Sequence, residues 1–266
     1  MRRCHAKRYG NVQFSGNLGI MIRDFLLAVG FFTRIPVPDH PNFSEKAMNN
    51  TSYYFPAIGL LVGLFNLGAF LIAQQFFTVP IAVIFSIGVG FLLTGGFHED
   101  GWADTFDGLG GAFDRDRKLE IMTDSRLGTY GSLALIFILS LKALSLSELM
   151  LLSVWPVFLL AHGLSRWVAM LAMVFCKYVR VAENKAKPVA QKISIVKWFF
   201  SGVVLMPVFL MIPPTVLGVV FIVALAVCLF WVVLLKRQLG GYTGDTLGAI
   251  QQSVEVAIYL GWLACI

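Results

Sequence analysis

The chain has 266 residues, of which 58% are hydrophobic and only 14% are charged. Soluble domains carry about 25% charged residues, so this composition excludes an ordinary soluble enzyme and predicts an all-α, polytopic membrane protein. Its four cysteines have no paired spacing, which excludes a disulfide framework and a cysteine-based zinc site. The sequence also lacks GxxxxGK[ST], which excludes a P-loop enzyme.

The N-terminal part of the chain divides at Met21. Residues 1–20 are basic and polar and show no apolar periodicity, so we expect a disordered, nonfunctional tail. Residues 21–266 are expected to form a single integral-membrane catalytic domain. Residues 22–32 are apolar but too few to cross a bilayer, which predicts a short interfacial or re-entrant helix.

Seven later stretches have the length and apolar composition of transmembrane helices, and their ambiguous ends allow six to eight. Long charged segments alternate with short connections that are nearly free of charge. Nineteen of the twenty-one lysines and arginines lie in the long segments, so the positive-inside rule places the N-terminus and these segments in the cytoplasm. The expected spans cover about residues 54–73, 78–97, 131–151, 154–175, 198–213, 215–235 and 247–266.

Three basic side chains fall within these spans: Lys142 in the third, and His162 and Arg166 in the fourth. An unpaired charge at the centre of a bilayer costs roughly 2.5–3.5 kcal/mol, so we expect all three to face the interior of the bundle. His162 and Arg166 are four residues apart and share a helix face. Arg166 is either a phosphate ligand at the floor of a cytoplasmic cavity or a structural residue. In the structural alternative, Lys142 and Arg166 bind backbone carbonyls or reach Glu148 and Glu255.

The stretch from Thr94 to Gly131 holds eight of the fifteen acidic residues and only four bases, so its formal charge is −4 in a chain of +6. Asp100, Asp104 and Asp107 are spaced i, i+4 and i+7, which places them on one face of a helix. Carboxylates on one face repel one another unless a cation neutralises them, and their oxygens suit Mg²⁺, Mn²⁺ or Ca²⁺. The spacing therefore predicts a metal site, with a solvated acidic loop as the alternative.

Other residues near this stretch have a less distinctive pattern. Arg117 and Arg126 follow the acids and either clamp a phosphate or form salt bridges with nearby acids. Asp124 and Asp245 either add ligands to the site or cap helices. The glycine-rich turn before Asp245 lies on the same predicted side of the membrane as the acids. These features together predict metal-dependent phosphoryl chemistry at the cytoplasmic face.

Several runs of sequence form a set: FTRIPVP at 32–38, YFPAIG at 54–59, TGGFHEDG at 94–101, ADT at 103–105, DG at 107–108, RKLEIM at 117–122, DSRLGT at 124–129 and LGGYTGDTLGA at 239–249. In this order they resemble cobalamin synthase, the adenosylcobinamide-GDP ribazoletransferase family. The resemblance runs from about residue 21 to the C-terminus, and its long acidic motif is highly specific. Residues 182–189 depart from the glycine-containing run expected there, so we assign this loop no role beyond its charge.

The resemblance implies an integral inner-membrane enzyme that uses Mg²⁺ in the last assembly step of the cobalamin nucleotide loop. A ribose hydroxyl of α-ribazole, or of its 5′-phosphate, attacks the cobinamide-linked phosphate of adenosylcobinamide-GDP, and GMP leaves. The motif assigns Asp100, Asp104 and Asp107 to catalysis and to the metal, and Asp124 is a further candidate ligand. The candidate substrate contacts, from the motifs and from the charges in the spans, are Arg34, His98, Arg117, Arg126, Arg166, Gly241, Thr243 and Asp245.

The expected partners are these small-molecule substrates and membrane lipid, with no nucleic acid; a homo-oligomer and an association with other nucleotide-loop assembly enzymes stay open. Two other functions fit parts of the sequence. A CDP-alcohol phosphotransferase also carries Asp-x-x-Asp-Gly, as at 104–108, but Gly111 and Ala112 replace the Ala-Arg that should follow. A divalent-cation transporter should hold its acids within spans, whereas this acidic stretch lies between them.

Overall fold

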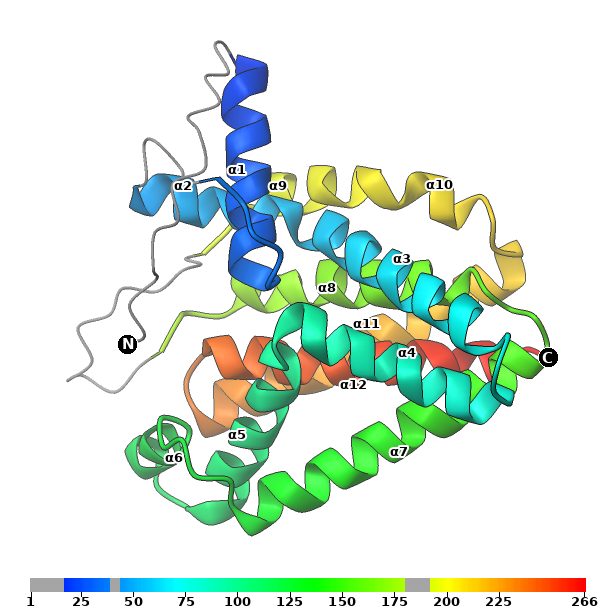
Figure 1. Ribbon diagram of the computed structural model, residues 1–266. Coiled ribbons are helices and arrows are strands. Elements are labelled where there is room, and N and C mark those ends of the chain that lie inside the picture. The colour runs from blue at the N-terminus through cyan, green and yellow to red at the C-terminus, as the bar shows by residue number, and fades with distance from the viewer. Residues whose placement is uncertain (1–16, 39–43, 180–191) are drawn as a thin grey trace.

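The computed structural model describes residues 17–38, 44–179 and 192–266, which form a bundle of α-helices (Figure 1). The described residues contain no β-strand, and their one isolated β-bridge joins Tyr178 to Tyr242. The helices in chain order are α1 (Asn17–Phe32), α2 (Glu45–Asn50), η1 (Thr51–Tyr54), α3 (Phe55–Ala73), α4 (Val79–Thr94), α5 (Phe97–Gly111), α6 (Arg115–Ile121), α7 (Thr129–Leu151), α8 (Val157–Phe175), α9 (Ile195–Ser201), η2 (Gly202–Leu205), α10 (Met206–Phe209), α11 (Pro214–Gln238) and α12 (Gly244–Leu263).

The apolar helices confirm a multi-pass helical membrane protein. Among the described residues, four helical segments are long and apolar enough to cross a membrane, and a fifth span results if α4 and α5 count as one broken span. The predicted number of seven spans is therefore not confirmed. The four segments are Ala47–Ala73, Thr129–Leu151, Val157–Phe175 and Pro214–Gln238.

Three of the predicted spans are not among these four segments for physical reasons. The second, α4, has only 16 residues and ends at the sharp bend before α5. The fifth is interrupted, because the chain passes from α9 through the 3₁₀ turn η2 into the short α10. The seventh, α12, carries Gln251, Gln252 and Glu255, all of which are buried. A helix enclosed by protein does not need an apolar surface on every side, so α12 lies inside the bundle although its composition is too polar for a lipid-facing span.

The N-terminal prediction and the basic loop are only partly covered by the structure. Helix α1 begins at Asn17, four residues before the boundary predicted at Met21. The first sixteen residues of the predicted tail lie outside the described residues, and so does most of the basic loop, residues 180–191. The division into a tail and one catalytic domain therefore stays a prediction.

Helix α12 occupies the middle of the bundle. It contacts α5, α7, α8 and α11, while α3 packs against both α4 and α8 (Figure 1). Because α12 begins at the glycine-rich turn and runs beside α5, the fold brings two motifs together that are more than a hundred residues apart in the sequence. The acidic helix and the start of α12 are therefore the place to look for a site.

Candidate active site

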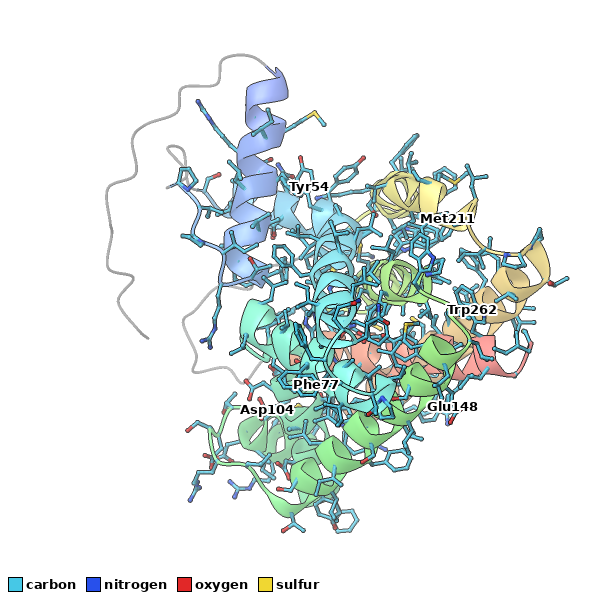
Figure 2. The ribbon with its side chains drawn as sticks, turned by 45° about the vertical axis from the view of Figure 1, so that its right-hand side comes forward. Tyr54, Phe77, Asp104, Glu148, Met211 and Trp262 are labelled. Carbon is cyan, nitrogen blue, oxygen red and sulfur yellow. The ribbon has the colours of Figure 1, made fainter. Side chains whose placement is uncertain are left out.

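A sharp elbow separates α4 from the acidic helix α5. The two helices meet at an angle of 89°. Gly95 and Gly96, which join them, have φ values of 72° and 71°, and only glycine adopts this left-handed region at no steric cost. The elbow turns α5 away from the line of α4, so that α5 presents its acids at one end of the bundle, where Figure 2 labels Asp104.

Three carboxylates of α5 gather near a fourth from α12. The predicted helical spacing of Asp100, Asp104 and Asp107 is confirmed, because all three lie within the single helix α5. Gly101 allows α12 to approach closely, since a Cβ atom at this position would lie only 2.7 Å from the backbone oxygen of Asp245. The helix that the acids share is thus held directly against the first turn of α12.

The electrostatics of this cluster are unusual. Burial raises the pKa of Asp104 to about 7, and repulsion from Asp100, Asp245 and Asp107 adds to the effect. Each neighbouring negative charge disfavours ionisation of Asp104. A cation placed among these carboxylates would relieve the repulsion, so the charge distribution favours binding of a divalent metal.

Asp107 has a second, structural task. Its Oδ2 atom accepts a hydrogen bond of 2.7 Å from the backbone nitrogen of Gly128, and its Oδ1 atom accepts one of 2.8 Å from that of Gly131. These donors belong to the N-terminus of α7, whose first amide groups lack partners within the helix. Asp107 therefore caps α7 from a neighbouring helix, which spacing along α5 did not predict. Each oxygen keeps a lone pair that could still face a metal.

The glycine-rich turn is fixed by backbone and side-chain contacts. Thr243 is the N-cap of α12, and it forms a reciprocal capping box with Thr246. The backbone of Gly241 lies so close to Lys177 that a Cβ atom would stand 2.1 Å from the lysine carbonyl oxygen. The hydroxyl of Thr243 also donates a 3.3 Å hydrogen bond to Asp245. This turn therefore has a structural explanation, and its predicted substrate contacts stay predictions.

The two arginines that follow the acids form ion pairs in the structure. Arg117 contacts Glu120 at 2.6 Å, and Arg126 contacts Asp124 at 2.6 Å. Hydrogen bonds from Arg126 lower the pKa of Asp124. Both pairs are solvent-exposed, where such pairs contribute little stability, so either arginine can leave its acid for a phosphate at small cost. The salt-bridge alternative for these arginines thus describes this structure.

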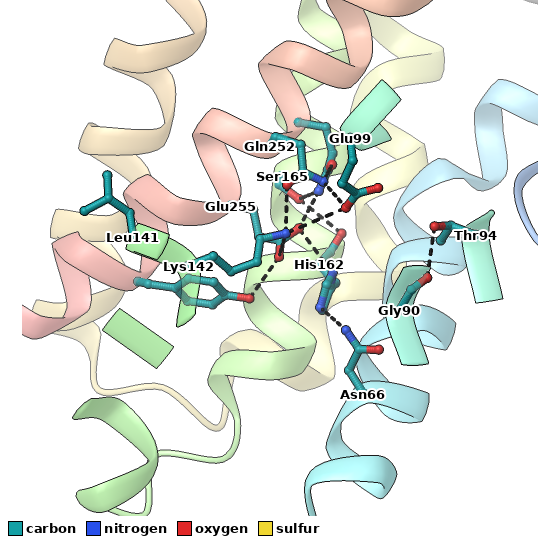
Figure 3. Close-up of polar contacts among 12 residues, drawn as sticks. Asn66, Gly90, Thr94, Glu99, Leu141, Lys142, His162, Ser165, Gln252 and Glu255 are labelled. Atoms are coloured by element: carbon teal, nitrogen blue, oxygen red, sulfur yellow. Dashed lines mark hydrogen bonds and ion pairs between the residues drawn. The ribbon is translucent and has the colours of Figure 1, made fainter. Parts of the chain in front are cut away.

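A network of buried charges lies behind the acidic helix, between α5, α7, α8 and α12 (Figure 3). Lys142 Nζ is 2.9 Å from Glu255 Oε1, and it donates a 2.7 Å hydrogen bond to Gln252 Oε1. His162 Nδ1 is 3.3 Å from Glu255 Oε2. The prediction that Lys142 and His162 face the interior is confirmed. Of the two acids proposed as structural partners of Lys142, it is Glu255 that pairs with it, whereas Glu148 is exposed.

The sequence analysis missed Glu99 and the glutamines of this network. Gln252 Nε2 donates a 2.8 Å hydrogen bond to Glu99 Oε1, and Gln251 Nε2 donates one of 2.6 Å to Glu255 Oε2. The sequence did contain an indication of this network, because Gln251, Gln252 and Glu255 lie within a largely apolar stretch. Because Gln251 and Glu255 are four residues apart, this pattern marks a buried polar face.

Three of the remaining candidates lie at the elbow or behind it. Arg34 follows α1, and its side chain lies beside Gly95. His98 and Arg166 are buried, and both line a cavity of about 20 Å³, which holds roughly one water molecule. Arg166 Nη1 donates a 2.9 Å hydrogen bond to the His162 carbonyl oxygen. Arg166 faces the interior as predicted, but this cavity is too small for a phosphate, so a substrate contact stays a prediction.

Comparison with known proteins decides the family. The model of a family described as Cobalamin-5-phosphate synthase matches residues 24–263. The chain belongs to this family. A relative from Shewanella amazonensis, named adenosylcobinamide-GDP ribazoletransferase, is 47% identical over 244 residues, which cover 89% of this chain and 93% of that protein. A relative with the same name from Vibrio cholerae is 44% identical over 242 residues, covering 90% and 93%. No solved structure matches the chain.

Membership in the cobalamin-5-phosphate synthase family makes the chain an enzyme of cobalamin synthesis, so neither the CDP-alcohol phosphotransferase nor the transporter interpretation is kept. For a cobalamin-5-phosphate synthase, the acids on α5 are the residues to test against Mg²⁺. Within the described ranges, no three Asp, Glu, His or Cys side chains are close enough to form a metal cage. Mg²⁺ is commonly bound by one or two carboxylates with water and substrate phosphates, so the cluster around Asp104 fits this ion.

Proposed function

We propose that this cobalamin-5-phosphate synthase joins adenosylcobinamide-GDP to α-ribazole or α-ribazole 5′-phosphate. A ribose hydroxyl attacks the cobinamide-linked phosphate, the bond between that phosphate and GMP breaks, and adenosylcobalamin or its 5′-phosphate is formed. The observation that carries this proposal is the family match, which spans the whole acidic helix and the turn before α12. The relatives that share this length are named adenosylcobinamide-GDP ribazoletransferase.

Asp100 and Asp104 are the residues that we propose as Mg²⁺ ligands, with Asp107 and Asp245 beside them. The pKa of Asp104 is raised by burial first and then by repulsion from neighbouring carboxylates, and this repulsion supports the choice because a bound cation would relieve it. Bound Mg²⁺ would neutralise charge on the diphosphate and its leaving group. Asp124 is a weaker candidate, since its carboxylate already accepts hydrogen bonds from Arg126.

The chain's own residues have separate tasks in this proposal. Asp107 is held by two backbone amides of α7, so it fixes the orientation of α5 and of the acids beside it. One of the acids on α5 would accept the proton of the attacking hydroxyl. Arg117 and Arg126 are exposed near the acids and would bind the phosphates of the GDP moiety in a bidentate manner. When bound substrate displaces water from these side chains, their electrostatic interactions with the phosphates become stronger.

We also propose that the protein lies in the inner membrane with this site in the cytoplasm. The support is the distribution of lysine and arginine over the long charged segments. Both the acidic helix and the turn before α12 lie within such segments. A cytoplasmic site would receive the nucleotide substrates without transport across the membrane.

The test is an assay of purified membranes with adenosylcobinamide-GDP, α-ribazole and Mg²⁺, in which released GMP and the corrinoid product are both measured. We expect wild-type turnover, loss of turnover in EDTA, and a fall of roughly a hundredfold or more for Asp104→Asn. Glu148→Gln is the matched control, because Glu148 is exposed and lies far from Asp104 (Figure 2). Membrane-inserted wild-type protein that forms no GMP would refute the proposed reaction, and full activity of Asp104→Asn would refute the metal site.

A further inference from the structure

An open groove lies at the elbow between α4 and α5. It has a volume of about 400 Å³, which is within the range of small-molecule sites. Its walls are mainly the apolar side chains of Phe91, Leu92, Leu135 and Leu139. The two elbow glycines form part of the wall, so backbone rather than side chain borders the groove there. A flat apolar group therefore fits between α4 and α7.

Two charged side chains, Arg34 and Glu99, line this groove, and Glu99 has an unmet hydrogen-bonding capacity. Glu99 borders both the open groove and the small cavity behind it. Its Oε1 atom accepts the hydrogen bond from Gln252, but its Oε2 atom is buried and has no hydrogen-bond partner among the described residues. In Figure 3 the second oxygen points away from the network, toward the part of α4 that carries Thr94. A buried acceptor without a donor is unfavourable because it has lost its hydrogen bonds to water, so a donor is expected at this position.

The network behind Glu99 holds its carboxylate in place. Gln252 accepts a hydrogen bond from Lys142 on its Oε1 atom, so its Nε2 atom must face Glu99. The same Nε2 atom lies 3.0 Å from Gln251 Oε1, which fixes the amide from a second side. Lys142 Nζ is also 4.0 Å from Glu99 Oε1. Glu99 is therefore held rigidly at the wall shared by the groove and the small cavity, and rigid support is what a binding residue requires.

We propose that this groove binds the nucleoside acceptor of the reaction, with its aromatic base between the apolar walls and a ribose hydroxyl donating to Glu99. This inference rests on the proposed function, which supplies an acceptor with both features. The position suits it: Glu99 precedes Asp104 by five residues, which is about 7.5 Å along a helix axis. A nucleoside is long enough to reach from the groove to the acids of α5.

The test measures equilibrium binding of α-ribazole to the detergent-purified full-length protein, together with the KM values for both substrates. Glu99→Gln keeps the shape and the contact with Gln252 but replaces the charged acceptor. We expect its Kd and KM for α-ribazole to rise roughly tenfold or more, with the KM for adenosylcobinamide-GDP unchanged. Leu135→Trp fills the groove and should have the same selective effect. The controls are Glu148→Gln and Leu144→Trp, which change exposed residues on α7.

The outcomes separate this inference from the reaction itself. An active wild-type enzyme in which Glu99→Gln and Leu135→Trp both bind α-ribazole normally would overturn the subsite. A variant that weakens the binding of both substrates equally would also overturn the subsite. That result would indicate a general loss of structure, or that water or lipid occupies the groove. A wild-type protein that neither binds α-ribazole nor releases GMP would instead refute the proposed function. Thermal unfolding of each variant shows whether it is folded.

Discussion

Lys142 offers a direct test of the buried network, because its charge lies deep within the bundle and is paired there. Lys142→Met removes the ammonium group and keeps a long apolar side chain. Glu255 then loses its ion pair at 2.9 Å, and Gln252 loses a hydrogen bond of 2.7 Å. Removing one partner of a buried pair costs about 3–5 kcal/mol, because the other charge stays buried. Gln251 and Tyr259 still donate to Glu255, which places the expected loss near the lower end, about 3 kcal/mol.

The assay is the free energy of unfolding in mixed detergent micelles, titrated with a denaturing detergent. A double-mutant cycle with Glu255→Gln isolates the pair, and we expect the double variant to recover much of the loss with a coupling energy of about 2 kcal/mol or more. Glu148→Gln on the same helix should change stability by no more than about 0.5 kcal/mol. If the free energy of unfolding of Lys142→Met is within about 0.5 kcal/mol of the wild-type value, the reasoning that the pair stabilises the bundle is refuted.

Three further predictions follow from other contacts. Asp107→Ala should lower the free energy of unfolding by about 1–2 kcal/mol, because α7 loses its cap. Asp104→Ala should not lower the free energy of unfolding, because removal of this carboxylate relieves repulsion. Equal losses for the two variants in denaturant titrations would contradict this prediction. In EDTA, the free energy of unfolding of the wild type should fall as the pH rises from about 4 to about 7. The reason is that Asp104 in the folded protein keeps its proton up to a pKa of about 7, whereas Asp104 in the unfolded chain loses its proton near the ordinary value of 3.8. If Asp104→Asn shows the same dependence of stability on pH, this prediction is wrong. With the other cysteines replaced, Lys185→Cys should react with an impermeant reagent only after the cells are opened, and Cys265 in intact cells; the reverse pattern would overturn the cytoplasmic site.

The sequence was sufficient for the helices and for the acidic face, because both depend on local periodicity. Apolar runs predicted α3, α7, α8 and α11 within a few residues, and the i, i+4, i+7 spacing correctly placed Asp100, Asp104 and Asp107 in one helix. The number of spans was less predictable. The elbow at Gly95 depends on backbone dihedral angles that two glycines permit but do not require, and α12 is too polar for a lipid-facing span because the bundle encloses it.

The site contacts that the sequence could not predict are those between distant segments. Glu99 and Gln252 are separated by 153 positions, and Asp107 caps a helix that begins more than twenty residues later. No spacing rule states which acid will meet Lys142, since Glu148 and Glu255 satisfy the same charge argument. What decides is that Glu255 lies on the buried face of α12 while Glu148 is exposed. Tertiary packing, not local pattern, selects the partner.

The buried network and the acidic cluster share α5 and α12, and this sharing has a physical consequence. Glu99 and Asp100 are consecutive residues, so their side chains point about 100° apart around the helix. When Gln252 holds Glu99 toward the interior, it helps to fix the rotation of α5 and therefore the direction in which Asp100 points. A loss of the contact with Gln252 would remove one of the contacts that position the acids of α5. The polar interior is thus required for the geometry of the surface site, and changes at Gln252 should alter catalysis without touching substrate.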